Sequence, residues 1–170
     1  MSNQDNYLKK IIISAVAKNG VIGRSNGEIP WHSKEEFQHF KNTTLGFPII
    51  MGRVTFDTLR KPLKGRLNIV ISRNDKLSYD FTDLKIFNSL ESAFSFCEEN
   101  NYHKIFIIGG AKIYGQAIKT ANEMIISKMD FKADGDVFFP KVDENDWKIK
   151  TMEKRDGFDV FFYVRNKIEN

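Results

Sequence analysis

Glu36 is the side chain in this sequence best placed for acid–base chemistry, because it stands beside Phe37 and one helical turn before Phe40. Side chains four residues apart lie on the same face of a helix, so Glu36 and Phe40 would line one apolar cleft. A carboxylate in such a cleft is costly unless a partner donates hydrogen bonds to it.

A purely structural role for Glu36 stays open at this point. Residues 33–36 read Ser-Lys-Glu-Glu and fit a capping box, in which the carboxylate bonds the amide of Ser33. Trp31 leaves a similar choice, because its indole N–H could hold a water beside the acid or its ring could only pack in the core. The polar, glycine-containing segment 23–29 has the composition of a lid over a site, or of an ordinary connecting loop.

Three strand-like segments end beside small or cationic residues, a pattern that indicates an anion site. Gly52 and the pair Gly109-Gly110 each follow an apolar strand pattern and precede a helix pattern, although a tight turn explains the diglycine equally well. Glycine lets a phosphate approach the backbone, and ligands of open α/β sheets gather beyond the carboxyl ends of the strands. The polar side chains at these three ends predict a nucleotide site: Arg53, Thr55, Ser72, Arg73 and Lys112.

The elements that must position these residues alternate between strand and helix. Strands are predicted over 10–17, 48–51, 67–72, 84–87 and 104–110, and helices over 33–43, 54–59, 89–100 and 111–120. After residue 120, strand patterns follow one another with little helix, in "EMIISKMD", "DVFFP", "WKIKTMEK" and "FDVFFYVRNK". Near-continuous apolar strands between helices are typical of a parallel sheet covered on both faces. We therefore expect a single α/β domain with a mixed, mostly parallel eight-stranded sheet, an antiparallel C-terminal edge and about four helices.

Composition narrows the class of protein further. The chain has 170 residues, which suits one domain over 10–170 behind a short extension over 1–9, and no apolar run is long enough to span a membrane. Cys97 is the only cysteine, so no disulfide can form within the chain, which fits a reducing cytoplasm. The three histidines have no spacing typical of a metal site. A net charge of +4 suits a small polyanionic ligand, and it would also suit a nucleic acid.

Five blocks, in order and between Ile11 and Arg165, resemble the dihydrofolate reductase family. They are "GVIG" with "IPW" and the Glu36–Phe40 set, then "PIIMGRVTF", "PLKGRLNIVIS", "IIGGAKIYGQ" and "DGDVFFP". The resemblance implies a cytoplasmic enzyme, expected to be monomeric, that reduces 7,8-dihydrofolate to tetrahydrofolate with NADPH. Its implied fold, an eight-stranded mixed sheet with four helices, agrees with the pattern of the elements.

The resemblance also assigns the substrate site. Glu36 matches the acid that binds the pterin, Ser127 a hydroxyl bonded to that acid, and Arg66 the arginine that grips the glutamate α-carboxylate. Trp31 joins Glu36 and Ser127 as a catalytic residue. The other implied substrate contacts are Ala15, Ile29, Phe37, Phe40, Leu59 and Ile108.

On the cofactor side, Gly109 and Gly110 match a diglycine with a cis peptide bond, and Ala111 stands where the family usually has a third glycine. Asp136 matches an acid that holds the active-site loop, here 23–29, closed. The implied cofactor contacts are Ala15, Ile22, Gly23, Gly52, Arg53, Thr55, Ser72, Arg73, Gly109, Gly110, Lys112, Ile113 and Tyr114.

Two other functions remain as alternatives. A pyrimidine reductase of riboflavin synthesis shares the fold and the cofactor, but the Pro30-Trp31 pair with Glu36 and Phe40 argues against it. A basic nucleic-acid-binding domain would show steeply salt-dependent binding and would need exposed aromatic side chains, whereas the phenylalanines here lie in apolar patterns.

Overall fold

The computed structural model describes residues 7–167, so most of the predicted extension over 1–9 lies outside it. At the end of that extension, Leu8 is already buried in the core and Lys9 begins the first strand. None of the helices among the described residues is long and apolar enough to cross a bilayer.

Strands and helices follow the predicted order. The elements are β1 (Lys9–Val16), β2 (Val21–Gly23), α1 (Lys34–Thr44), β3 (Ile49–Gly52), α2 (Arg53–Leu59), β4 (Asn68–Ile71), β5 (Leu84–Phe87), α3 (Leu90–Glu99), β6 (Lys104–Gly109), α4 (Ala111–Ala117), β7 (Glu123–Met129), β8 (Val137–Phe138), β9 (Trp147–Lys154) and β10 (Phe158–Arg165). The predicted boundaries of the elements lie close to the observed ones. The largest difference is at α4, which was expected to reach residue 120 and ends at Ala117. The short strand β2 was not predicted.

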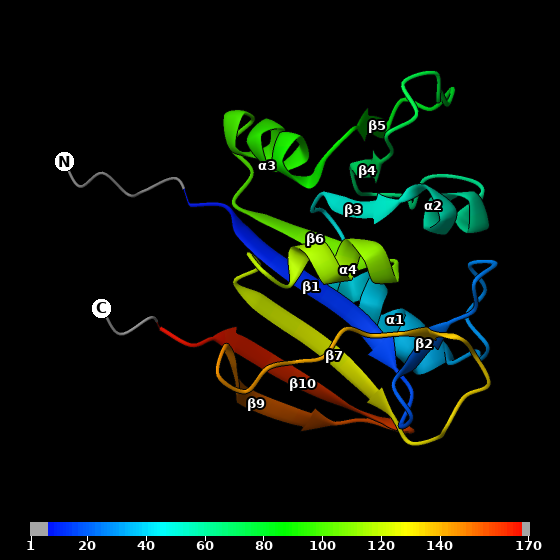
Figure 1. The fold of residues 1–170 in the computed structure, drawn as a ribbon, viewed down its shortest axis with the longest axis vertical. Coiled ribbons are helices and arrows are strands. Elements are labelled where there is room, and N and C mark those ends of the chain that lie inside the picture. The colour runs from blue at the N-terminus through cyan, green and yellow to red at the C-terminus, as the bar shows by residue number, and fades with distance from the viewer. Residues whose placement is uncertain (1–6, 168–170) are drawn as a thin grey trace.

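The main sheet has eight strands in the order β5-β4-β3-β6-β1-β7-β10-β9, as Figure 1 shows. Its first six strands are parallel, and β10 runs antiparallel to both β7 and β9. This confirms the mixed sheet with an antiparallel C-terminal edge. The prediction for "DVFFP" was wrong in one respect, because β8 does not join that edge. It pairs with β2 in a separate two-stranded sheet, where Phe138 remains 52% exposed.

Two helices cover each face of the main sheet, with α4 in front of it and α1 behind it in Figure 1. Because side chains alternate along a strand, Ile12 of β1 packs in the core beneath α3 and α4, whereas Ile11 and Ile13 pack beneath α1 and α2. The same alternation places Ala15 of β1 and Ser127 of β7, which are paired in register, on the face that α1 covers. The carboxyl end of β7 therefore brings a polar group, the Ser127 hydroxyl, to the helix that carries Glu36.

Candidate active site at the carboxyl edge of the sheet

The first turn of α1 fixes the position of Glu36. Ser33 is the N-cap, and its hydroxyl accepts a hydrogen bond from the Glu36 amide at 3.2 Å, so the serine half of the predicted capping box is present. The Glu36 carboxylate is half-buried and interacts with the Ser127 hydroxyl on the neighbouring sheet. The carboxylate of Glu36 is therefore directed toward the sheet, whereas the helix cap is formed by the Ser33 hydroxyl and the Glu36 amide.

Burial and Ser127 act on Glu36 in opposite directions. Removal from water raises the pKa of the Glu36 carboxyl above its ordinary value, and the nearby Ser127 hydroxyl lowers it by a smaller amount. Ser127 is 1% exposed, and within residues 7–167 its oxygen has no partner at the distance and angle of a full hydrogen bond. An acid and an unsatisfied hydroxyl thus share an otherwise apolar face, which suits a ligand that carries several N–H donors.

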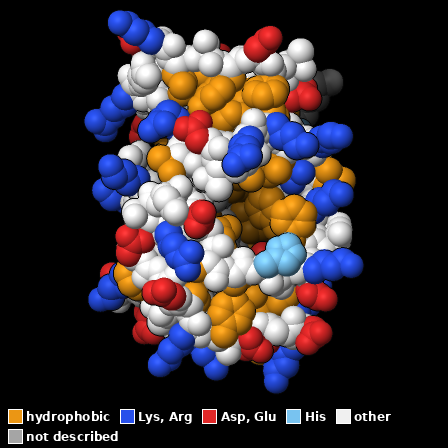
Figure 2. Space-filling model, turned by 90° about the vertical axis from the view of Figure 1, so that its right-hand side faces the viewer, with side chains coloured by type: hydrophobic (Ala, Val, Ile, Leu, Met, Phe, Trp, Pro, Cys, Tyr) orange, Lys and Arg blue, Asp and Glu red, His pale blue; other side chains and the backbone are white. Residues whose placement is uncertain are grey.

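Hydrophobic side chains surround this polar pair. Phe40, Leu59 and Ile108 pack against the core on the α1 face, whereas Phe37 and Ile29 are 57% and 60% exposed. Figure 2 shows this side of the molecule, where hydrophobic side chains line a hollow with lysines and arginines around it. The apolar lining of this hollow suits a ligand with apolar faces.

Trp31 packs in the way that its structural interpretation predicts. Its ring is half-buried and meets Phe131 edge-on, with the ring centroids 5.6 Å apart and the planes at 68°. It belongs to the same apolar layer as Phe40. This packing fixes the ring at the wall of the cleft, and the water that Trp31 was expected to hold beside Glu36 stays a prediction.

Arg66 lies at the far end of α1 from Glu36. It is 8% exposed, and it donates from Nη1 to the Thr44 hydroxyl and from Nε to the Lys64 carbonyl, both at 3.0 Å. Burial lowers the pKa of its guanidinium. From residue 36 to residue 44, α1 rises about 12 Å. The acid and the arginine are therefore placed at opposite ends of α1.

Glycines at the ends of β3 and β6 form a backbone cradle. The Gly109–Gly110 peptide bond is cis, as the resemblance implied. A Cβ on Gly52 would lie 3.3 Å from Ile113 and 4.0 Å from the Gly110 nitrogen, and one on Gly110 would lie 3.5 Å from the Thr55 hydroxyl. These distances show that the ends of β3 and β6 and the start of α2 come together at positions occupied by glycine. The cradle therefore fits a phosphate group that must approach the backbone.

Tyr114 of α4 packs against this cradle. Its hydroxyl donates to the Ile13 carbonyl at 2.7 Å, and a Cβ on Gly109 would lie 3.2 Å from its ring. Burial raises the pKa of Tyr114, with a smaller contribution of the same sign from the charge of Glu36. Tyr114 therefore connects β1 with the glycine cradle.

The family model for dihydrofolate reductase matches residues 10–165. The chain belongs to the dihydrofolate reductase family. It is 36% identical over 167 residues to the dihydrofolate reductase of Staphylococcus haemolyticus, covering 95% of this chain and 98% of that one. The enzyme of Neisseria meningitidis serogroup A is 44% identical over 142 residues, covering 83% and 85%. Neither the riboflavin-pathway reductase nor the nucleic-acid-binding domain is favoured by these findings.

A solved dihydrofolate reductase has the same fold. The structure from Enterococcus faecalis, complexed with NADP(H) and RAB-propyl, superimposes with a TM-score of 0.82 at 25% identity and covers 94% of this chain and 97% of that one. This agreement confirms the expected architecture of the dihydrofolate reductase family.

Most residues that the resemblance assigned lie at the carboxyl edge of the sheet or on the helices beside it. Arg66 differs, because it precedes β4 and so lies near the opposite edge. Besides the assigned residues described above, Ile22 and Gly23 lie in β2, Arg53 begins α2, Ser72 and Arg73 follow β4, and Lys112 lies in α4.

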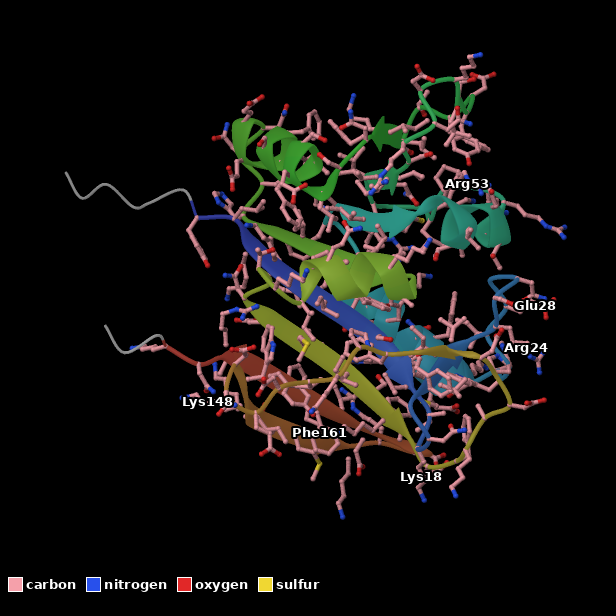
Figure 3. The ribbon with its side chains drawn as sticks, viewed as in Figure 1. Lys18, Arg24, Glu28, Arg53, Lys148 and Phe161 are labelled. Carbon is pink, nitrogen blue, oxygen red and sulfur yellow. The ribbon has the colours of Figure 1, made fainter. Side chains whose placement is uncertain are left out.

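Segment 23–29, the predicted lid, is tied to the loop before β8. The Ser25 amide donates to the Asp136 carboxylate at 2.8 Å, and this hydrogen bond is the main reason why the pKa of Asp136 is lowered. Within the segment, the Arg24 amide donates to the Glu28 carbonyl at 2.8 Å, which closes a turn. Figure 3 shows Arg24 and Glu28 on the same side of the molecule as Arg53.

The sequence reasoning missed two side chains beside Arg53. Asp57 accepts a hydrogen bond from Arg53 at 2.7 Å and another from the Tyr79 hydroxyl at 2.8 Å. The four-residue spacing of Arg53 and Asp57 on α2 was a usable signal for the first contact. Tyr79 lies in the loop between β4 and β5, where no periodic pattern indicates its partner.

Proposed function

We propose that this enzyme reduces 7,8-dihydrofolate to 5,6,7,8-tetrahydrofolate, with one NADPH and one proton consumed for each NADP⁺ and tetrahydrofolate formed. The observation that carries the proposal is the half-buried Glu36 carboxylate beside the unsatisfied Ser127 hydroxyl, in a cleft walled by aromatic side chains. Membership of the dihydrofolate reductase family supports the same reaction.

Glu36 would hold the pterin by accepting two parallel hydrogen bonds, from the 2-amino group and the ring N3. Such a pair of charge-assisted bonds fixes the face and the angle of the ring, with Phe40 packed against it. The same negative charge favours a proton on N5 of the pterin, which makes the adjacent carbon a better hydride acceptor. Trp31 would keep bulk water out and hold one water near the carboxylate.

The residues of the cradle fit a phosphorylated dinucleotide. When bound there, NADPH supplies the hydride. Gly52, Gly109 and Gly110 leave space against the backbone, and Thr55 offers a hydroxyl beside them. Arg53, Arg73 and Lys112 are exposed cations that would neutralise phosphate charge, and Ser72 would add a hydroxyl. The remaining apolar members of the set, Ala15, Ile22, Ile113 and Tyr114, would shape the pocket around the nicotinamide.

At the other end of the cleft, Arg66 would grip the α-carboxylate of the glutamate tail. Its bonds to Thr44 and Lys64 restrict the side chain before the ligand arrives, so less conformational entropy is lost on binding. We expect the enzyme to act as a monomer in the cytoplasm. Cys97 is buried, and burial raises the pKa of its thiol to about 12, so it fits the role of a core residue.

The direct test follows the absorbance of reduced nicotinamide in the purified protein. We expect NADPH to be consumed only after dihydrofolate is added, with tetrahydrofolate formed in equal amount. A rate no higher than that of the substrate-free control would contradict the proposed function.

A further inference from the structure

One carboxylate links two segments of the chain that carry expected phosphate contacts. Asp57 on α2 accepts from Arg53 Nη1 through Oδ2 at 2.7 Å and from the Tyr79 hydroxyl through Oδ1 at 2.8 Å. Arg53 belongs to α2, whereas Tyr79 belongs to the same β4–β5 connection as Ser72. Both oxygens of Asp57 are therefore engaged, and the two segments are joined through it.

The aromatic ring of Tyr79 anchors this arrangement in the core. It meets Phe56 edge-on, with the ring centroids 4.7 Å apart, and Phe56 is 1% exposed. Desolvation, together with the Asp57 carboxylate, raises the pKa of Tyr79 to about 12, so the phenol keeps its proton and remains a donor at neutral pH. A continuous set of contacts thus leads from a buried phenylalanine to an exposed arginine.

We propose that Asp57 and Tyr79 are positioning residues that orient Arg53 toward the 2′-phosphate of NADPH and so contribute to its selection over NADH. This inference rests on the proposed function. The Tyr79 hydroxyl donates to Oδ1 and the guanidinium pairs with Oδ2 through Nη1, so the observed Asp57–Arg53 pair has one bond and not two. Arginine has five N–H donors, so the bond through Nη1 leaves others for the ligand.

Orientation of Arg53 before the cofactor binds would increase the affinity for NADPH. The Arg53 side chain is 49% exposed, and a free arginine at such a site loses rotamer freedom when it closes on a phosphate. A guanidinium that is already held at one nitrogen loses less of that freedom, so more of the interaction appears as affinity. NADH lacks the 2′-phosphate, and its binding should not depend on this arrangement.

The experiment is Tyr79→Phe, which removes the hydroxyl and keeps the ring against Phe56. Dissociation constants for NADPH and NADH are measured by isothermal titration calorimetry without substrate, so that no turnover is involved. We expect the constant for NADPH to rise about threefold to tenfold, the scale of one ordinary hydrogen bond, and that for NADH to stay within about twofold. Equal changes for both cofactors, or no change for NADPH, would overturn the proposal.

Two control variants remove the same kinds of group, a tyrosine hydroxyl and a carboxylate paired with arginine, at positions away from Arg53. Tyr102→Phe removes a tyrosine hydroxyl just before β6. Glu153→Gln breaks another exposed pair, in which Arg155 lies 2.8 Å from the Glu153 carboxylate. Both should leave the ratio of the two dissociation constants unchanged, and a shift as large as that of Tyr79→Phe would overturn the assignment.

A double-mutant cycle shows whether Tyr79 acts through Asp57. In an Asp57→Ala background, Tyr79→Phe should no longer change the ratio of the NADPH and NADH constants. An undiminished effect would mean that Tyr79 does not act through the carboxylate, which overturns the proposal. If the unmodified protein consumes NADPH with dihydrofolate but these variants do not change selectivity, positioning by Asp57 and Tyr79 fails and the proposed function stands. A protein that binds neither cofactor would contradict both.

Discussion

At the scale of single residues, the chemistry of this enzyme centres on an acid that is held partly out of water. Burial raises the pKa of Glu36 and Ser127 lowers it, so the two effects work against each other at one carboxyl group. An ionised Glu36 is therefore destabilising in the ligand-free fold, and a ligand with N–H donors relieves that cost.

This cost predicts a pH-dependent effect of Glu36→Gln on stability. The folded-state pKa lies above the unfolded value, so the stabilising contribution of Glu36 is complete below the unfolded pKa and is lost as pH rises through the folded pKa. In urea unfolding, the free energy of unfolding of Glu36→Gln, relative to that of the parent protein, should increase as the pH rises from acid to neutral. Glu35→Gln, in the same turn, controls for the helix dipole. A constant difference across this pH range would contradict the prediction.

Ser127 offers a second test at the residue scale. Because its hydroxyl lowers the pKa of Glu36, Ser127→Ala should raise that pKa further, whereas Ser127→Thr keeps a hydroxyl and should leave it nearly unchanged. The measurement is a titration of the Glu36 carboxyl carbon by NMR. A midpoint in Ser127→Ala that does not move, or that moves down, would show that the hydroxyl has no such influence.

At the scale of elements, the pairing of β2 with β8 brings the lid segment and the loop before β8 into close contact. A Cβ on Gly135 would lie 2.5 Å from the Gly23 carbonyl oxygen, so the backbone of one segment would have to move. The hydrogen bond from Ser25 to Asp136 lies directly beside this contact. The absence of a side chain at Gly135 thus allows the close approach of segment 23–29, the predicted lid.

Two glycine-to-alanine substitutions test whether the effect is specific to Gly135. Gly135→Ala should destabilise the protein by about 1–3 kcal/mol, the usual cost of overpacking, and should weaken cofactor binding by loosening the lid. Gly115→Ala lies within α4 with nothing within 4 Å of the added Cβ, and it should stabilise the protein by about 0.5–1 kcal/mol. Thermal unfolding of both variants checks the pair, and similar melting temperatures would contradict the argument.

The pattern of apolar residues explains why most helices and strands could be predicted from the sequence. Short, near-continuous apolar runs indicate buried strands and a period near 3.6 indicates helices, so the mixed sheet and its antiparallel edge could be predicted. Periodicity does not report which strand a two-residue segment such as β8 will join, and that prediction was wrong. Contacts between segments distant in sequence, such as Glu36 with Ser127, came only from the family resemblance, and Asp57 with Tyr79 was missed.

At the scale of the whole molecule, a net charge of +4 favours a polyanionic ligand. Exposed charges are screened by salt, so NADPH affinity should fall about twofold to fivefold when ionic strength rises from low to several times physiological. NADH carries less charge and should lose less. Calorimetric titrations in a salt series check this, and equal losses for the two cofactors would contradict a role for the exposed cations.

The central claim is that the Glu36 carboxylate orients the pterin and assists its protonation. The most direct measurement is the single-turnover rate of dihydrofolate reduction by Glu36→Gln at neutral pH, beside the parent protein and Glu35→Gln. We predict a loss of about 10²–10⁴-fold for Glu36→Gln alone, the usual scale of assisted proton transfer, with NADPH affinity unchanged. A Glu36→Gln enzyme that turns over at the parental rate would contradict the account.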